Sequence, residues 1–311
     1  MTMKDFIEEQ SNVIDATLAR RGATGRVTGG CVTPEWIRFT VTPAIGVTPT
    51  DIKEQAEHLA QALGVSELRV SRRGALASVE IRPPDPRPVR LLPFLQGMDT
   101  IPPLTAALGI CDDGAPLLVR LPAADVGSVA VVGEGRGELL RMMALSLALL
   151  HTPDALRLAL IGDGLADLAR LPHTGHRATT AGTWEALKLL AHVVDTGRAT
   201  PPLVAFVADL EAVQPFGKEA TAVLRTLLQE GPARGIYLVA GSADSPRLPF
   251  GPRMRNEHGK WVAHTVNGWR WRFFPATVTP EETLTLVDSM NAQHQALPLP
   301  ALAVGKGAAY G

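Results

Sequence analysis

The sequence predicts an α/β protein in which a parallel sheet, covered by helices on both faces, follows a small α+β module of the β-α-β-β type. Two observations indicate this fold class. From about residue 129 onward, continuous apolar runs alternate with helical runs, and strands of a parallel sheet buried on both faces have this composition. Before a proline-rich stretch at residues 82–88, the apolar runs are shorter and partly alternating, as expected for half-buried strands.

Residues 1–90 are predicted to form the small module. Its second helix has a clear start, because Thr48, Pro49 and Asp51 supply a hydroxyl cap, a first-turn proline and an acid at the third position. The same helix ends at Gly64. The predicted elements, in order, are a helix over 3–21, a strand over 35–41, a helix over 48–64, and strands over 67–70 and 77–81.

Residues 91–296 are predicted to form the larger domain, and residues 297–311, rich in Pro, Ala and Gly, a disordered tail. Asn267-Gly268 is a two-residue hairpin signal, and Thr-Pro-Glu-Glu at 279–282 starts a last helix. The predicted strands cover 129–132, 156–161, 203–208, 236–240, 261–266 and 269–274, and the predicted helices cover 138–150, 165–170, 183–194, 219–230 and 279–291.

A glycine-rich loop, with Gly133, Gly135 and Gly137, joins the first strand of the larger domain to its first helix. Strand, glycine-rich turn and helix form the geometry that surrounds a phosphate with backbone N–H groups and a positive helix end. Three interpretations stay open: a tight turn that only permits close packing, a weak nucleotide or anion site, and a dinucleotide site. The last has least support, because the loop reads GxGxG and its fingerprint is GxGxxG.

Composition excludes several classes of function. A net charge of −1 provides no global field for nucleic acid or membrane, so a nucleic-acid contact must be local. Cys31 and Cys111 are isolated and the histidines lack ligand spacing, which indicates neither a disulfide framework nor a metal site. No apolar run approaches the ~20 residues of a membrane-spanning helix. We therefore expect a cytoplasmic protein with reduced thiols, no metal and no membrane segment.

Basic residues form two clusters that a DNA-contacting surface would explain. Arginines on a strand can reach phosphates, although alternating Arg and Trp more often marks one solvated and one buried face. The first cluster lies in the small module and contains Arg69, Arg72 and Arg73. The second, our candidate DNA-binding set, contains Arg253, Arg255, Lys260, Arg270 and Arg272, interleaved with Trp269 and Trp271.

Short motifs occur along the chain in a definite order: Gly-Cys-Val-Thr-Pro at 30–34, Gly46-Val47, Asp-Gly-Ala-Pro at 113–116, the run at 153–163, Leu-Pro-His at 171–173 and Arg-Gly-Ile-Tyr-Leu at 234–238. Their order resembles the FtsK/SpoIIIE family of DNA translocases over nearly the whole chain. The resemblance implies an FtsK α-like domain at 1–90 and a RecA-like motor domain with a P-loop NTPase fold at 91–296. It also implies ring assembly and duplex DNA as a partner; the family's membrane segment and winged-helix domain do not fit into this length.

The catalytic positions of that family are altered here. Its phosphate loop reads GxxxxGK[ST], whereas Glu138 and Leu139, or Leu139 and Leu140, occupy the Lys and Ser/Thr positions. The strand-end acid is present as Asp209, but Leu210 follows it where the family has Glu. The loop after Ala240 lacks the family's Gln and Arg, and Pro232 replaces an arginine.

These losses predict a catalytically inactive subunit, a pseudo-ATPase without catalytic residues, that is a structural, regulatory or DNA-binding part of a translocase-type ring. We expect it to assemble with itself or with an active FtsK-like partner, and to need no cofactor beyond, at most, weakly bound ATP or ADP. Two alternatives stay open: a DNA translocase with an atypical P-loop, and a protein-interaction adaptor in a secretion or defence complex. The vestigial nucleotide-binding residues would be Gly133, Gly135, Arg136, Gly137 and Asp209.

Overall fold

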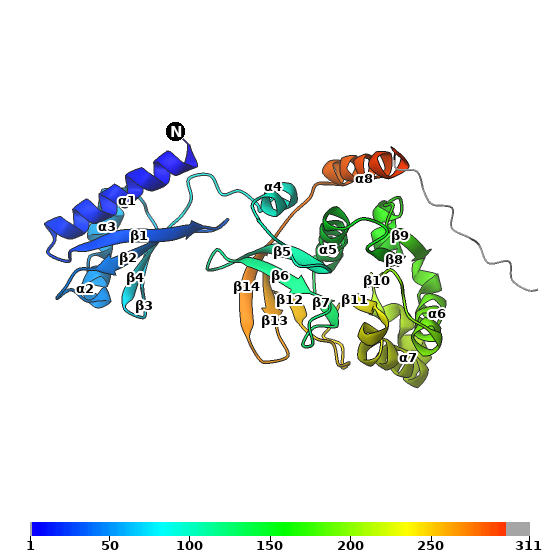
Figure 1. Ribbon diagram of the computed structural model, residues 1–311. Coiled ribbons are helices and arrows are strands. Elements are labelled where there is room, and N and C mark those ends of the chain that lie inside the picture. Colours follow the sequence, from blue (N-terminus) through cyan, green and yellow to red (C-terminus); the bar gives the residue numbers. More distant parts are fainter. Residues whose placement is uncertain (1, 297–311) are drawn as a thin grey trace, which may run out of the picture. The chain divides into compact units, whose positions relative to one another are not determined.

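The computed structural model describes residues 2–296 (Figure 1), so the tail predicted at 297–311 lies outside the described residues. The chain divides into two compact units, which we describe separately. Unit 1 contains residues 1–90 together with 109–117 and 271–276, and unit 2 contains the remainder. Within the described part of the chain, no helix combines the length and apolarity that crossing a membrane requires.

Unit 1 is built on a four-stranded antiparallel sheet with the strand order β1-β2-β4-β3. The predicted helix starts are confirmed, since Thr2 and Thr48 each form a capping box with the acid three residues later. The elements are α1 (Met3–Arg20), β1 (Gly25–Val32), β2 (Ile37–Pro43), α2 (Pro49–Glu54), α3 (Ala56–Leu63), β3 (Leu68–Arg73) and β4 (Leu76–Ile81).

Strand β1 was not predicted, so the small module has one strand more than the expected β-α-β-β pattern. Its sequence contains Gly25, Gly29 and Gly30 and no apolar alternation, which resembles a loop. Pairing with β2 makes it a strand, with a register shift between Val27 and Gly29. Gly30 is required there, because a Cβ at that position would lie 2.2 Å from the backbone oxygen of Arg38.

The second sheet has ten strands in the order β6-β5-β14-β13-β12-β7-β11-β10-β8-β9. From β12 to β9 the neighbouring strands are parallel, which confirms the predicted parallel sheet, whereas β13 and β5 form antiparallel pairs. The strands are β5 (Thr105–Cys111), β6 (Pro116–Arg120), β7 (Ser128–Val132), β8 (Arg157–Ile161), β9 (Thr174–Ala178), β10 (Leu203–Val207), β11 (Ile236–Ser242), β12 (Arg253–Glu257), β13 (Lys260–His264) and β14 (Arg270–Pro275).

The sheet is therefore mixed rather than wholly parallel. Strands β5, β6, β9 and β12 were not predicted, because they contain Gly, Pro, His or Arg in place of a continuous apolar run. The turn predicted at Asn267-Gly268 is present, with the Thr265 N–H donating to the Trp269 carbonyl, but the predicted two-residue loop is wrong, because β13 ends at His264 and β14 begins at Arg270.

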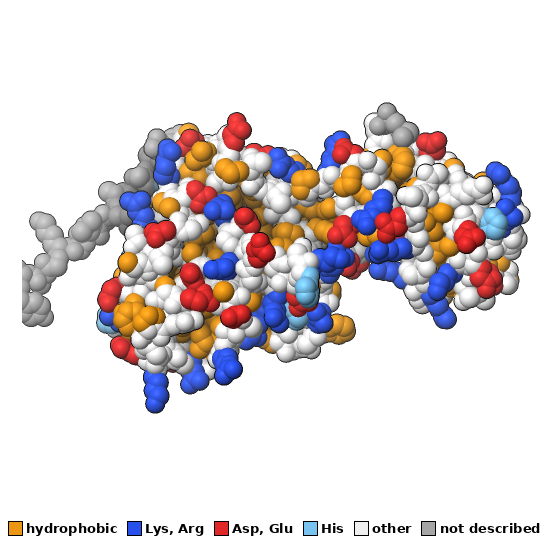
Figure 2. Space-filling model, turned by 180° about the vertical axis from the view of Figure 1, so that it is seen from behind, with side chains coloured by type: hydrophobic (Ala, Val, Ile, Leu, Met, Phe, Trp, Pro, Cys, Tyr) orange, Lys and Arg blue, Asp and Glu red, His pale blue; other side chains and the backbone are white. Residues whose placement is uncertain are grey.

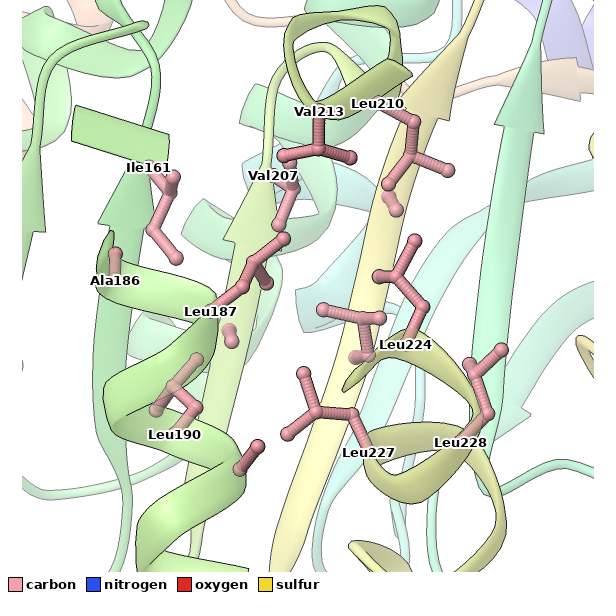
Figure 3. Close-up of a cluster of buried hydrophobic side chains, with 14 of the residues drawn as sticks. Ile161, Ala186, Leu187, Leu190, Val207, Leu210, Val213, Leu224, Leu227 and Leu228 are labelled. Carbon is pink, nitrogen blue, oxygen red and sulfur yellow. The ribbon is translucent and has the colours of Figure 1, made fainter. Parts of the chain in front are cut away.

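Helices cover both faces of the parallel strands, as predicted. On one face, α6 and α7 pack on alternate strand residues such as Ala205, Val207 and Ala240 in a single buried cluster (Figure 3). Gly241 points to the opposite face, where a Cβ would lie 2.9 Å from Leu140 of α5. The described α-helices outside the small module are α4 (Leu91–Gln96), α5 (Arg136–Leu150), α6 (Thr183–Thr196), α7 (Gly217–Gln229) and α8 (Pro280–Ala296).

Candidate functional site

The glycine-rich loop is short and held by a side chain from another strand. Strand β7 ends at Val132 and α5 begins at Arg136, and Gly133 and Gly135 have φ values of 99° and 76°, which favour glycine. The Asn256 side chain donates to the Glu134 carbonyl at 2.9 Å and accepts from the Gly259 N–H at 2.8 Å. The loop is thus ordered by the protein itself.

Asn256 could not be identified from the sequence. It lies 122 residues from Glu134, and its only local signal is the turn that Gly259 completes. The mixed sheet brings it to the loop, because β12 pairs in parallel with β7 and Arg255 lies opposite Val132.

The residues at the family's Lys and Ser/Thr positions do not supply that family's phosphate-binding and metal-binding groups. Gly137 lies inside α5, and Leu139 and Leu140 are 2% and 0% exposed and belong to the core. Glu138 is exposed at the helix start. Its Oε2 atom lies 3.2 Å from where a Cβ of Gly135 would be, so a carboxylate lies beside the loop.

The helix start, the loop and the end of β10 line a cavity of about 410 Å³. Four of the five predicted nucleotide-site residues contribute to it, and Gly133 does not. Across the cavity, Nη2 of Arg136 lies 3.9 Å from Oδ2 of Asp209, and both side chains are about one-third exposed. The lining residues are Gly135, Arg136, Gly137, Glu138, Arg141, Gly164, Thr180, Ala208 and Asp209.

Asp209 caps the short 3₁₀ helix that follows β10. Its Oδ1 accepts the Glu211 N–H at 3.0 Å. The pKa of Asp209 is raised, first because its carboxyl shares a hydrogen bond with the Glu211 carboxyl and second because it is partly buried. Asp209 therefore serves as the cap of this helix.

Glu211 faces a different part of the molecule. Its Oε1 accepts from the Ser242 hydroxyl at 2.7 Å and from the Ala243 N–H at 2.9 Å. Burial raises the pKa of Glu211, but hydrogen bonds from Asp209, Ser242 and Ala243 outweigh burial and lower it to about 2. Glu211 lines a second cavity of about 590 Å³, between the start of α7 and the loop after β11, and is absent from the lining of the 410 Å³ cavity.

The residues around the 410 Å³ cavity do not fit a Mg²⁺–nucleotide. P-loop NTPases hold the phosphates with Lys and Mg²⁺ with a Ser/Thr and a strand-end Asp. Of these groups, the lining contains Asp209 and one hydroxyl, that of Thr180, but no Lys. Asp209 already has Arg136 and Glu211 as partners, and the Thr180 hydroxyl accepts the Asp163 N–H at 3.2 Å.

Part of the candidate DNA-binding set shares one face of the β12–β13 hairpin. Arg253, Arg255 and Glu257 alternate along β12, and Glu257 lies opposite Lys260. Arg255, Lys260 and Arg270 are exposed, while Arg270 and His264 both contact the Glu257 carboxylate at 2.8 Å. In the view of Figure 2, Lys and Arg side chains lie among Asp and Glu side chains, as the net charge leads one to expect.

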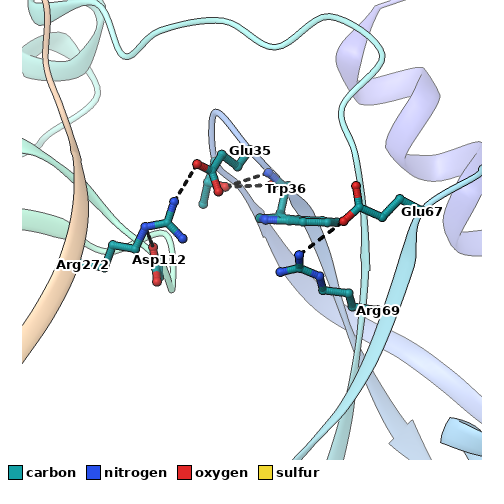
Figure 4. Close-up of polar contacts among 7 residues, drawn as sticks. Glu35, Trp36, Glu67, Arg69, Asp112 and Arg272 are labelled. Carbon is teal, nitrogen blue, oxygen red and sulfur yellow. Dashed lines mark hydrogen bonds and ion pairs between the residues drawn. The ribbon is translucent and has the colours of Figure 1, made fainter. Parts of the chain in front are cut away.

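The other two members of the set have partners within the protein. Nη2 of Arg253 donates to the Leu248 carbonyl at 2.9 Å. Nη2 of Arg272 lies 2.6 Å from Glu35 Oε1, and its Nε lies 3.8 Å from Asp112 Oδ1 (Figure 4). Arg272 therefore ties β14 to the β1–β2 turn within unit 1, and a DNA role for any of the five residues stays a prediction.

The histidines have structural contacts. His173 is 2% exposed and its Nε2 lies 2.7 Å from the His151 carbonyl. Nε2 of His151 accepts the Leu104 N–H at 2.9 Å. Among residues 2–296, no group of three or more His, Cys, Asp or Glu side chains is arranged to hold a metal ion.

Comparison with known proteins identifies the small module. The model of the FtsK alpha domain matches residues 1–81. The DNA translocase SftA of Bacillus subtilis (strain 168) is 24% identical over 277 residues, an alignment that covers 76% of this chain and 29% of SftA. The chain thus spans less than a third of that relative.

Solved structures share the fold. The cytoplasmic domain of the type VII secretion ATPase EccC of Thermomonospora curvata matches with a TM-score of 0.56 at 20% identity, over 68% of this chain and 34% of that one. EssC (ATPases 2 and 3) of Geobacillus thermodenitrificans matches with a TM-score of 0.51 at 13% identity, over 71% of this chain and 54% of that one. The large mixed sheet has the RecA-like fold of these ATPases. The chain is therefore related to the FtsK/SpoIIIE DNA translocases and carries an FtsK alpha domain over residues 1–81.

Proposed function

We propose that the chain is an FtsK-like subunit that does not hydrolyse ATP and acts as a structural, regulatory or DNA-binding component of a ring assembly. The observation that carries the proposal is the 410 Å³ cavity, where Arg136 pairs with Asp209 and no Lys, Ser or Thr follows the loop. Glu211, the remaining acid near the strand end, contacts Ser242 and Ala243 instead. Leu210, which follows Asp209 where the family has Glu, cannot orient an attacking water.

Electrostatics support weak nucleotide binding at most. A carboxylate about 4 Å from a phosphate is repelled by ~1–4 kcal/mol, depending on the local dielectric. Glu138 lies at the loop, and the attraction that the P-loop lysine provides is absent. Arg136 and Arg141 are the cations of the lining, and each already has an acidic partner, Asp209 and Asp167. We expect ATP or ADP to bind weakly or not at all.

Steady-state ATP turnover of the purified full chain tests the proposal. We expect no turnover, with or without duplex DNA. The matched variants are Asp209→Ala, in the 410 Å³ cavity, and Asp244→Ala, which removes a carboxylate from the lining of the second cavity. Turnover that Asp209→Ala abolishes and Asp244→Ala leaves intact would show an atypical active translocase and overturn the proposal.

The DNA-binding part of the proposal rests on Arg255 and Lys260, which are exposed on one face of the β12–β13 hairpin, and on Arg270, which is exposed at the start of β14 and pairs with Glu257. The name of the relative SftA, a DNA translocase, supports duplex DNA as the partner. We expect salt-dependent binding that weakens when all three are replaced by Ala. Replacing Arg198, Lys218 and Arg225, which are exposed elsewhere in unit 2, removes the same charge and is the control.

The second candidate function is a protein-interaction adaptor without DNA contact. The likeness in fold to a type VII secretion ATPase supports this candidate. Duplex DNA binding by the full chain would exclude it. Light scattering of the chain, alone and mixed with an FtsK-like protein that has an intact GxxxxGK[ST] loop, tests ring assembly. A chain that stays monomeric in both samples would contradict the ring.

A further inference from the structure

The sheet of unit 1 carries its helices on one face. Ile14 and Leu18 of α1, Ile52 of α2 and Leu59 of α3 join one buried cluster with the core-facing residues of the strands. Because side chains alternate along a strand, the neighbours of those core residues point to the opposite face. That face has no helix among the elements of unit 1.

The opposite face presents hydroxyls and arginines in register. One row contains Arg26 opposite Thr42 and, at the far edge, Arg73 opposite Leu76. The next row contains Gly29, Thr40, Ser78 and Ser71. We call Arg26, Thr28, Thr40, Thr42, Ser71 and Arg73 the open face. All are exposed except Thr40, which is half-buried, and the Thr28 and Thr42 hydroxyls lie 3.0 Å apart.

The next row of cross-strand neighbours lies on the same side of the sheet but is not part of the open face, because its charged side chains already have partners. It contains Cys31, Arg38, Glu80 and Arg69. Arg38 and Glu80 form a largely buried ion pair at 2.6 Å, and Gly114 lies directly against Cys31. Arg69 pairs with Glu67 at 3.3 Å and stacks over Trp36 at 4.2 Å (Figure 4). The charges of this row are therefore satisfied internally.

The cations of the open face are available. Arg26 and Arg73 are exposed, and neither forms an ion pair with another described residue. No acidic side chain belongs to the open face as defined. Two uncompensated arginines therefore flank a row of hydroxyls on a sheet that spans about 15–20 Å across its four strands.

We propose that the open face contacts the phosphates of duplex DNA, in addition to the candidate DNA-binding residues of unit 2. Phosphate oxygens are bound by Arg, by Ser and Thr hydroxyls and by backbone N–H groups, and the open face supplies the first two. It contains no aromatic side chain, so stacking with unpaired bases is not expected. The contact would be independent of sequence. The inference rests on the proposed DNA-binding role but uses different residues.

The experiment is a salt titration of duplex DNA binding by the full chain. The test variant is Arg26→Ala/Arg73→Ala. Its control is Arg21→Ala/Lys53→Ala, which removes the same charge at the ends of α1 and α2. We expect the test variant to reduce the slope of log K against log salt by roughly 1.8, since each lost phosphate contact removes about 0.9. The control should keep the wild-type slope.

The outcomes separate this inference from the proposed function. An unchanged slope in Arg26→Ala/Arg73→Ala, with binding lost on replacing Arg255, Lys260 and Arg270, would overturn this inference alone. A wild-type chain that binds no duplex DNA would overturn both. Binding to vesicles of phosphatidylserine and phosphatidylcholine in place of DNA would assign the open face to a membrane surface and overturn it as well. Circular dichroism of each variant verifies that it is folded.

Discussion

The parallel strands of unit 2 and the antiparallel strands of unit 1 bury their side chains in different ways. All residues of β7 and β11 are buried, because helices cover both faces. In β2 and β3, core residues alternate with Thr, Ser and Arg, because helices cover one face. A strand that is covered on both faces can place functional groups only at its ends, whereas a strand that is covered on one face can present polar groups along its length.

This difference locates the candidate sites. Beside the strands of unit 2 that helices cover on both faces, the candidate polar residues follow strand ends, as Arg136 follows β7 and Asp209 follows β10. In unit 1, they lie on the strands themselves, as Arg26 and Arg73 do. Four predictions test the comparison, beginning with the largest expected effect.

A core truncation should cost far more in the parallel strands than a change on the open face. Phe206, in β10, is 0% exposed. We expect Phe206→Ala to lower the free energy of unfolding by about 3–5 kcal/mol, measured by urea denaturation. Thr40→Ala, on the open face of β2, should change it by about 0.5 kcal/mol or less. Similar losses for the two variants would contradict the one-sided burial of the β2 strand.

Breaking the buried ion pair between Arg38 and Glu80 in the sheet of unit 1 should lower stability more than breaking an exposed ion pair of the same unit. Arg38 and Glu80 lie 2.6 Å apart, with side chains 10% and 13% exposed. We expect Glu80→Ala to cost about 3 kcal/mol, because it leaves the Arg38 charge buried without a partner. The control, Glu67→Ala, breaks an exposed contact to Arg82 at 2.9 Å and should cost far less than Glu80→Ala, because water screens an exposed ion pair. Equal costs would mean that Arg38 finds another partner.

Glu211 should make stability depend on acid pH. Its pKa in the fold, about 2, is below the ordinary 4.5. The carboxylate therefore stabilises the protein fully above about pH 4.5, and this contribution is lost as the pH falls to about 2. The pKa of the neighbouring Asp209 is shifted in the opposite direction.

We expect Glu211→Gln to lower stability at pH 7 by about 1–2 kcal/mol, since hydrogen bonds to a charged acceptor are lost. The difference in stability between Glu211→Gln and the wild type, measured by thermal melts, should disappear as the pH falls from 4.5 to 2. A gap that stays constant over this range would show that Glu211 does not titrate with folding, and Glu219→Gln, exposed on α7, serves as the control.

The smallest effect should come from the ion pair across the 410 Å³ cavity. Arg136 and Asp209 are 3.9 Å apart and about one-third exposed, so Arg136→Ala should change the free energy of unfolding by about 0.5 kcal/mol. Urea denaturation measures this value, with Arg225→Ala on α7 as the control. A loss of several kcal/mol would mean that the pair holds the loop together, a role that we assign to Asn256.

Several features follow from local chemistry and were predicted from the sequence. The capping boxes at Thr48 and Thr279 depend on residues three positions apart, so sequence spacing suffices to find them. The buried strands β7, β10 and β11 are continuous apolar runs between turn residues. The glycine-rich segment of β1 forms a strand only because it pairs with β2. Its own residues have no local preference for a strand that could have predicted it.

By itself, the sequence determined the α/β class, the order of the buried strands β7, β8, β10 and β11, and the absence of Lys, Ser and Thr after the glycine loop, because these depend on residue type and short spacing. Tertiary structure alone decided that Asn256 holds that loop, that Arg272 pairs with Glu35, and that Arg26 and Arg73 share one face. These contacts join strands far apart in the chain. Their geometry follows from strand pairing and register, which the order of residues within one strand does not specify.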